Sequence, residues 1–272
     1  MADWGVFDGA QRVDAYGAAT GTSEGTTITV PGSTNTKGSY TQLTSSTSAD
    51  AVGLVVSGRI SGSAALSVLI DIAVGGSGSE QVIIADMVGV RLPSANSGWA
   101  PFFIPISIPA GTRISARYQT TSTSSTLTMS VQAVAATTNY GMVYPRVASY
   151  GGNTSTSKGV VVDPGTSANT KGSYVEITSA TSFKSSNCVI IPISETAALE
   201  ASWLFDIAIG GSGSEQVIAS NIQMFGNSTA GTTTHRLSFP LVIPAGVRVA
   251  VRAQCSSTAS GRTFQVTMHL SG

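Results

Sequence analysis

The chain has little charge, no excess of either sign and few aromatic residues. Only 10% of its 272 residues are Asp, Glu, Lys or Arg, and the 14 basic residues are balanced by 14 acidic ones. A nucleic-acid-binding protein ordinarily carries a basic excess, because it displaces counterions from phosphates. Direct binding of DNA or RNA is therefore not expected. The hydrophobic share is 42%, which suits a folded chain with a neutral, hydroxyl-rich surface rather than a disordered one.

Residues that carry catalytic and metal chemistry are also scarce. The two histidines, His235 and His269, and the two cysteines, Cys188 and Cys255, have no short metal-ligand spacing, so no zinc site is predicted. A Ser-His-Asp site needs a histidine held in a cleft by an acid, whereas His269 falls on the polar face of its strand, either solvated or at an interface. We predict no catalytic residue, no metal and no cofactor. Buried free thiols are favoured for the cysteines, and a single disulfide is the alternative.

The sequence also gives no indication of a secretory signal or of a membrane-spanning segment. The first five residues, Met1–Gly5, contain no basic segment followed by an apolar run, so no secretory signal is predicted. The most apolar long stretch, Leu54–Val74, is interrupted by Arg59 and Asp71, so no membrane span is predicted either. We expect synthesis in the cytoplasm and no membrane partner.

What the chain does contain is a tandem duplication. The motif Asn-Thr-Lys-Gly-Ser-Tyr at Asn35–Tyr40 returns at Asn169–Tyr174. The motif Gly-Gly-Ser-Gly-Ser-Glu-Gln-Val-Ile at Gly75–Ile83 returns unchanged at Gly210–Ile218. The motif Ile-Pro-Ala-Gly follows each copy, at Ile108–Gly111 and Ile243–Gly246. Because the order is kept throughout, we interpret the chain as an N-terminal arm (1–11), a first repeat (12–136), a linker (137–145) and a second repeat (146–272).

Each repeat has the periodicity of β-strands. Apolar Leu127, Met129 and Val131 alternate with polar residues, and Phe264–Leu270 alternates in the same way. Alternation over this length predicts half-buried antiparallel strands, and Gly-, Ser- and Pro-rich turns follow at short intervals. We therefore predict an all-β chain of two tandem antiparallel β-sandwich domains that resemble jelly rolls.

The duplicated charged residues are the candidate contacts between domains or subunits. Asp71 to Ile83 is predicted to be a strand, a tight glycine turn and a second strand; without a Lys-Ser or Lys-Thr after the turn, it is not a phosphate-binding loop. We expect its carboxylates to pair with the duplicated arginines, within or between subunits, and contact with an outside partner is the alternative. The set comprises Asp71, Glu80, Arg113 and Arg117 in the first repeat and Asp206, Glu215, Arg248 and Arg252 in the second.

The N-terminal arm lies outside the repeat and holds Trp4 and Phe7. An apolar tip on a polar terminus is typical of a segment that docks on a neighbouring subunit. The alternative is that the arm folds back onto its own first domain.

The repeated motifs resemble a module of tailed-bacteriophage virion proteins. The resemblance is carried by Asp-Ile-Ala-Val/Ile-Gly-Gly-Ser-Gly-Ser-Glu-Gln-Val-Ile, followed by Pro-x-x-Ile-Pro-Ala-Gly-x-Arg-x-x-x-Arg-x-Gln. It covers most of both repeats. It implies a structural protein of the particle surface, with other capsid, neck or tail proteins as partners. It also implies a homo-oligomer, and trimers are common among such modules.

Three functions follow as hypotheses from these observations. The leading one is a non-enzymatic capsid decoration or cement protein of the virion, which assembles through its β-sandwich faces. The alternative is a neck, collar or tail-fibre component that binds a host glycan or receptor, for which Trp99, Tyr140, Tyr144, Tyr150 and Trp203 are the available aromatics. An enzyme such as a glycan depolymerase would need paired acids in a cleft, and no sequence signal indicates one.

Overall fold

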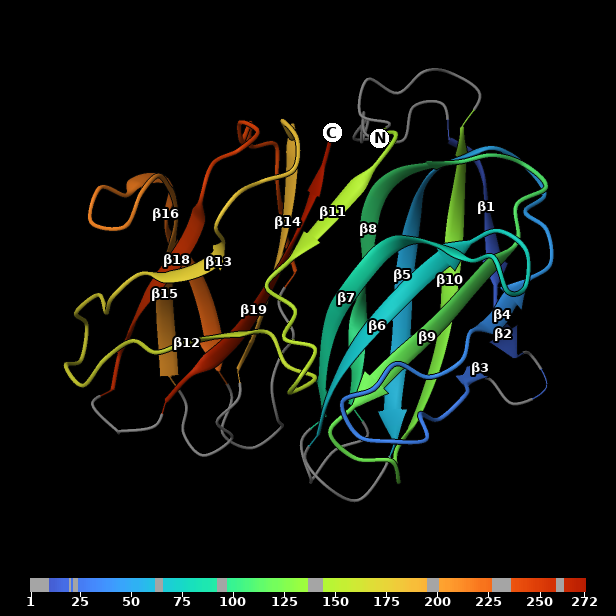
Figure 1. Cartoon of the computed structure of the whole chain (residues 1–272), viewed down its shortest axis with the longest axis horizontal. Helices are drawn as coiled ribbons and strands as arrows, with labels where there is room; N and C mark the ends of the chain where they lie inside the picture. Colours follow the sequence, from blue (N-terminus) through green and yellow to red (C-terminus); the bar gives the residue numbers. More distant parts are fainter. Residues whose placement is uncertain are drawn as a thin grey trace, which may run out of the picture.

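The computed structural model describes residues 10–19, 21, 24–61, 66–91, 97–136, 144–194, 201–226, 236–257 and 262–272. All regular elements in these residues are β-strands, and neighbouring strands within each sheet pair antiparallel. The predicted fold class, two tandem antiparallel β-sandwich domains, is confirmed (Figure 1). Within the described residues no helix is long and apolar enough to cross a bilayer.

The strands of the first domain form two sheets. One is six-stranded and the other four-stranded. The six-stranded sheet has the order β2 (Ala18–Ala19), β3 (Glu24–Ile28), β10 (Thr126–Ala136), β5 (Ala51–Ser61) and β8 (Ser97–Ile108), with β1 (Ala10–Tyr16) also paired to β10. The four-stranded sheet has the order β4 (Thr41–Thr44), β9 (Ile114–Thr120), β6 (Leu66–Val74) and β7 (Gln81–Arg91).

The second domain repeats this arrangement. Its five-stranded sheet has the order β11 (Val147–Tyr150), β19 (Phe264–Ser271), β14 (Asn187–Ser194) and β17 (Leu237–Phe239), with β12 (Val160–Val162) also paired to β19. Its four-stranded sheet has the order β13 (Val175–Thr178), β18 (Val249–Cys255), β15 (Ala201–Ile209) and β16 (Gln216–Gly226).

The strand order is that of a jelly roll in both domains. The order β3-β10-β5-β8 in the first domain matches β12-β19-β14-β17 in the second, and β4-β9-β6-β7 matches β13-β18-β15-β16. Apart from the hairpins β6–β7 and β15–β16, the neighbours on these paths are not consecutive in the chain, as in the paired Greek keys of jelly rolls. The two duplicated halves therefore fold to the same topology.

Alternation along the strands fills the two cores. On β10, Leu127, Met129 and Val131 are buried in the first core, while Thr128 and Ser130 are only partly covered. In the second core, Trp203 packs edge-to-face against Phe264, with ring centroids 5.5 Å apart. Trp203 is 2% exposed, which corrects its assignment as an aromatic available to a sugar.

The two domains pack against each other along β7. Figure 1 shows the second domain beside this strand, with β11 next to it. Val189, Ile191 and Ile193 on β14 point away from their own core and belong to the apolar cluster of the first domain. Burial of three aliphatic side chains stabilises such a contact by about 1.5 to 3 kcal/mol each at most. The outward side of β14 is therefore an inter-domain surface.

Candidate functional site

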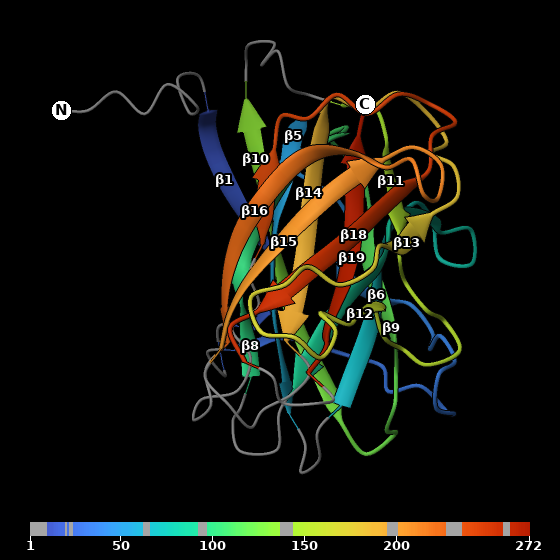
Figure 2. The same cartoon turned by 90° about the vertical axis from the view of Figure 1, so that its left-hand side faces the viewer.

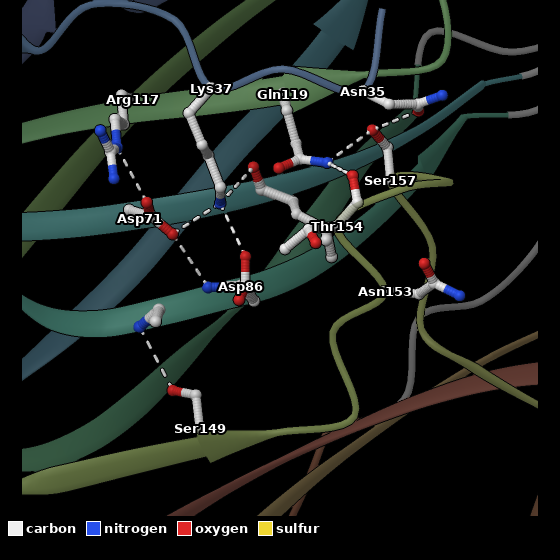
Figure 3. Close-up of polar contacts among 12 residues, drawn as sticks. Asn35, Lys37, Asp71, Asp86, Arg117, Gln119, Ser149, Asn153, Thr154 and Ser157 are labelled. Atoms are coloured by element: carbon white, nitrogen blue, oxygen red, sulfur yellow. Dashed lines mark hydrogen bonds and ion pairs between the residues drawn. The ribbon is translucent and has the colours of Figure 1, made fainter.

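A buried aspartate organises one face of the first domain. Asp71 on β6 accepts a charged hydrogen bond from Lys37 Nζ at 2.6 Å and another from Arg117 Nε at 2.9 Å. The backbone N–H of Asp86 donates to the same carboxylate at 3.0 Å. Arg117 also lies over the ring of Tyr40, 4.6 Å from its centroid. Figure 3 shows Lys37 and Arg117 at the Asp71 carboxylate. The contacts explain the motif Asn35–Tyr40, because its Lys binds the aspartate and its Tyr lies under the arginine.

The second domain holds the same cluster. Lys171 Nζ and Arg252 Nε each lie 2.9 Å from the Asp206 carboxylate, and the Asn221 N–H donates to it at 2.8 Å. Burial alone would raise the pKa of Asp206, but the hydrogen bonds from Asn221, Lys171 and Arg252 outweigh it and hold the pKa below its usual value. Asp206 is thus a structural anion rather than a proton donor or acceptor near neutral pH.

A second pair of charges clamps each glycine hairpin. In the first domain, Arg113 Nη1 reaches Glu80 Oε1 at 3.1 Å and the Gly75 carbonyl at 3.0 Å. The Gly78 N–H donates to Glu80 Oε2 at 2.9 Å. Gly75 and Gly78 have φ of 105° and 83°, a region that glycine enters without penalty. The hairpin therefore needs its glycines for the turn and its glutamate for the clamp.

The corresponding clamp in the second domain has nearly the same geometry. Arg248 Nη1 lies 3.0 Å from Glu215 Oε1 and 3.2 Å from the Gly210 carbonyl. Hydrogen bonds from the Glu215 backbone N–H and then from Arg248 and Gly213 hold the pKa of Glu215 below its usual value. In these contacts each of the eight sequence-predicted charged residues has a partner in its own domain. Trp4 and Phe7 lie outside the described residues.

A shallow cleft of about 440 Å³ lies beside the first hairpin, against the Ile-Pro-Ala-Gly turn. Val74, Ile83 and Pro109 form apolar parts of its wall, and Arg113 is its ionisable residue. The guanidinium of Arg113 is already held by Glu80. Elsewhere in the described residues, no group of three His, Cys, Asp or Glu side chains is placed to hold a metal ion.

A hydroxyl-bearing loop of the second domain is clasped by two amides of the first. Gln119 Nε2 donates to the Thr154 carbonyl at 2.6 Å and to Ser157 Oγ at 3.0 Å. The Ser157 hydroxyl in turn donates to Asn35 Oδ1 at 2.7 Å. One hydroxyl is therefore bound as both acceptor and donor, as Figure 3 shows. Sequence reasoning missed this role because Gln119 resembles any polar residue of an outward strand face.

The loop approaches the first domain so closely that it requires glycine at position 152. A Cβ on Gly152 would lie 2.4 Å from Asp86 Cβ, far inside the separation of about 3.5 to 4.0 Å that carbon atoms prefer. Nearby, the Ala85 N–H donates to Ser149 Oγ at 3.2 Å. Ser149 therefore connects β7 of the first domain to the second domain.

His269 lies at this domain boundary. Its Nδ1 is 2.8 Å from Ser149 Oγ, and its side chain is fully buried. Of the two environments left open by the sequence, the structure places it at an interface. Burial, and then the charge of Arg236, lowers the pKa of His269 to about 4. The imidazole is therefore neutral at physiological pH.

Both cysteines are buried and free, as expected from the sequence. Burial raises the pKa of Cys188 to about 12. A thiol with such a pKa is almost wholly protonated near neutral pH, so Cys188 is a poor nucleophile.

The second domain carries an open copy of the amide clasp. Asn169 and Gln254 stand where Asn35 and Gln119 stand in the first domain: Asn35 N–H donates to the Thr120 carbonyl and Asn169 N–H to the Cys255 carbonyl, both at 2.8 Å. The φ angles of Asn35 and Asn169 are also similar, at 53° and 56°. Gln119 is 1% exposed, whereas Gln254 is partly exposed and Asn169 exposed. The four-stranded sheet β13-β18-β15-β16, which carries Gln254 on β18, faces the viewer in Figure 2.

Comparisons with known proteins give no assignment for this geometry. No family model matches the chain, and no curated protein matches it. A solved structure with some similarity is the N-terminal CBM22-1-CBM22-2 tandem domain from Paenibacillus barcinonensis Xyn10C. The identity is 13%, the match covers 85% of this chain and 82% of that chain, and the TM-score is 0.29. A likeness of this size carries no functional argument.

Proposed function

We propose that the chain is a non-enzymatic structural protein on the surface of a tailed-bacteriophage particle, most specifically a capsid decoration protein. In this proposal it assembles as a homo-oligomer, with other virion proteins as partners, through the outer faces of its β-sandwiches. The sequence resemblance to virion modules points to the particle. The placement of the charged residues supports the non-enzymatic part.

The observation that carries the proposal is the use of the duplicated ionisable side chains. Asp71 and Asp206 are each about 3% exposed and lie between a lysine and an arginine of their own domain. Glu80 and Glu215 each lock a hairpin. Residues that a hydrolase would direct into a cleft instead stiffen the sandwiches, and stiff modules with neutral surfaces suit a component of a large assembly.

A second candidate is a neck, collar or tail-fibre component that binds a host glycan. The open copy of the amide clasp on the second domain favours it, because planar amides that both donate and accept hydrogen bonds are suited to sugar hydroxyls. Both candidates are components of the particle, and they differ in their location on it and in what the exposed face contacts.

Gold-labelled antibodies on intact particles from the lysate that produces this protein test the proposal. Label over the heads is the expected result for a decoration protein. Label confined to the neck or tail would replace it with the second candidate. Particles that carry no label, with the protein found only in the particle-free fraction, would remove the virion assignment altogether.

A further inference from the structure

We propose that the open amide clasp of the second domain, formed by Asn169 and Gln254, is a binding site for a hydroxyl-rich glycan. This inference deepens the second candidate function by naming its site and ligand class. The occupied clasp in the first domain serves as the internal template, because it shows which group these amides hold when they are filled.

The template binds a hydroxyl in both directions. Ser157 Oγ accepts from Gln119 Nε2 at 3.0 Å and donates to Asn35 Oδ1 at 2.7 Å. Such a donor-and-acceptor pair matches a sugar hydroxyl, which has one O–H and two lone pairs like serine. Asn169 and Gln254 repeat the two residues on the same backbone, and within the described residues the side chain of Gln254 has no hydrogen-bond partner.

A second copy of this chain does not fit the open clasp in the template geometry. The loop that would correspond to Tyr150–Gly159 is Tyr16–Gly25, and it has Ala18 where the docked loop has Gly152. Asn221 occupies the place of Asp86, since the backbone N–H of each donates to the central aspartate. The Ala18 methyl would therefore meet Asn221 as a Cβ on Gly152 would meet Asp86, at 2.4 Å.

A protein docked on the open clasp would lack the apolar contacts that accompany the filled clasp of the first domain. Val88 is buried in the same cluster as Ile191 and Ile193 at the domain boundary. The corresponding position on β16 is Gln223, which is exposed. A polar ligand needs no such apolar contact, so the face suits a glycan better than a docked protein domain.

The charge of the face also differs from the template. In the first domain, Lys37 is shared by Asp71 and Asp86, whose carboxylates lie 2.6 and 2.8 Å from its Nζ. In the second domain, the neutral Asn221 replaces Asp86, so Lys171 has one carboxylate neighbour fewer. Acidic sugars should therefore bind the face more tightly than neutral ones of the same size.

The affinity of one site is expected to be low. The ring of Tyr174 is covered by Arg252, 4.6 Å from its centroid, so a sugar loses that ring face as a stacking surface. Two or three hydrogen bonds exchanged against water support a dissociation constant on the order of a millimolar. Many copies on one particle would raise the overall avidity without any new contact.

Ligand-observed NMR on the full-length chain tests the site. The probes are oligosaccharides of glucose, galactose, mannose, xylose and N-acetylglucosamine, together with uronic-acid oligosaccharides, at millimolar concentration. We expect at least one probe to bind, and Gln254→Leu to weaken it at least tenfold with no change in Tm. The matched control is Gln119→Leu in the filled clasp, which should lower Tm and leave sugar binding unchanged.

Three results would overturn the site. One is the absence of binding by every probe, and another is equal binding by the wild type and Gln254→Leu. The third is a synthetic peptide of residues 150–159 that binds more tightly than any sugar, which would assign the face to a protein loop. Because these measurements use purified protein, they can fail while particle labelling succeeds, and the reverse also holds.

Discussion

Replacing Gly152 with alanine should loosen the packing between the two domains. The new Cβ would lie 2.4 Å from Asp86 Cβ and 3.0 Å from its Cγ, so the loop must retreat by roughly 1 Å to reach normal carbon separations. Overpacking of this kind costs about 1 to 3 kcal/mol. The retreat would also strain the nearby bonds from Gln119 to Thr154 and from Ala85 to Ser149. We expect the free energy of unfolding to fall by about 2 kcal/mol.

Calorimetry measures this effect directly. About 2 kcal/mol corresponds to a decrease in Tm of roughly 4 to 8 °C for a chain of this size. If the domains are uncoupled, one cooperative transition should also separate into two. Ala18→Gly, at the matching position of the first domain, is the control for the intrinsic difference between glycine and alanine.

A double-mutant cycle identifies the clash as the cause. Asp86 has a φ of 51°, so Asp86→Gly is compatible with the backbone and removes the atom that the new methyl group at position 152 would strike. In that background, Gly152→Ala should cost almost nothing, which gives a coupling energy of about 2 kcal/mol. An undiminished cost in the double variant, or a Gly152→Ala protein as stable as the wild type, would refute the reasoning.

Four further predictions follow from the described contacts. Asp206→Asn should lower stability by about 2 kcal/mol near neutral pH, less than for a fully buried pair because Arg252 is partly exposed. The depressed pKa of Asp206 gives stability that is present above its unfolded pKa of about 4 and lost as pH falls through the folded value. Urea titrations should show this acid loss in the wild type and a smaller one in the variant. The pKa of His269 is about 4 in the folded protein, against an ordinary value of 6.5. As pH falls across that window, the free energy of unfolding should decrease by about 2 to 3 kcal/mol. His269→Gln should flatten the profile, and an unchanged slope would contradict the burial argument. Cys188 should react with a thiol reagent only after denaturation, and rapid labelling of the native protein would disprove its protection. Deleting residues 2–9, the part of the N-terminal arm that precedes β1, should abolish docking on a neighbouring subunit while Tm stays constant, and a parallel loss of Tm would show that the arm belongs to its own domain.

Local pattern predicted the strands and the duplication, because side chains alternate across a sheet whatever its topology. The strand order did not follow, because it depends on pairings such as β3 with β10 between segments far apart in the chain. His269 shows a second limit. It alternates with Met268 and Leu270 like a solvent-facing residue, yet it is fully buried. Its polar face is covered by another domain, and period-two alternation carries no information about that cover.

Identical residues in the two repeats also acquired different roles that only the structure distinguishes. Gln119 and Gln254 stand in the same motif and pair with corresponding positions of their neighbouring strands, Leu69 and Leu204. One is buried by the second domain and the other is not. A repeat detected in sequence therefore locates a candidate site twice, and the domain packing decides which copy is free.

The two repeats differ at the positions through which one domain packs against the other. Val55 on β5 and Val189 on β14 pair with corresponding positions of the central strands, Gln132 and His269. Two and four residues further on, β14 has Ile191 and Ile193 where β5 has Ser57 and Arg59. Apolar Ile191 and Ile193 are thus found where one domain meets the other, and polar Ser57 and Arg59 occupy the matching positions of the first domain. Ala18 in place of Gly152 is a further difference of the same kind, because a methyl group at that position would hinder docking of this loop on an identical face. The contact that fills the clasp of the first domain is therefore not repeated at Gln254, which is partly exposed, and this is the condition that the proposed glycan site requires.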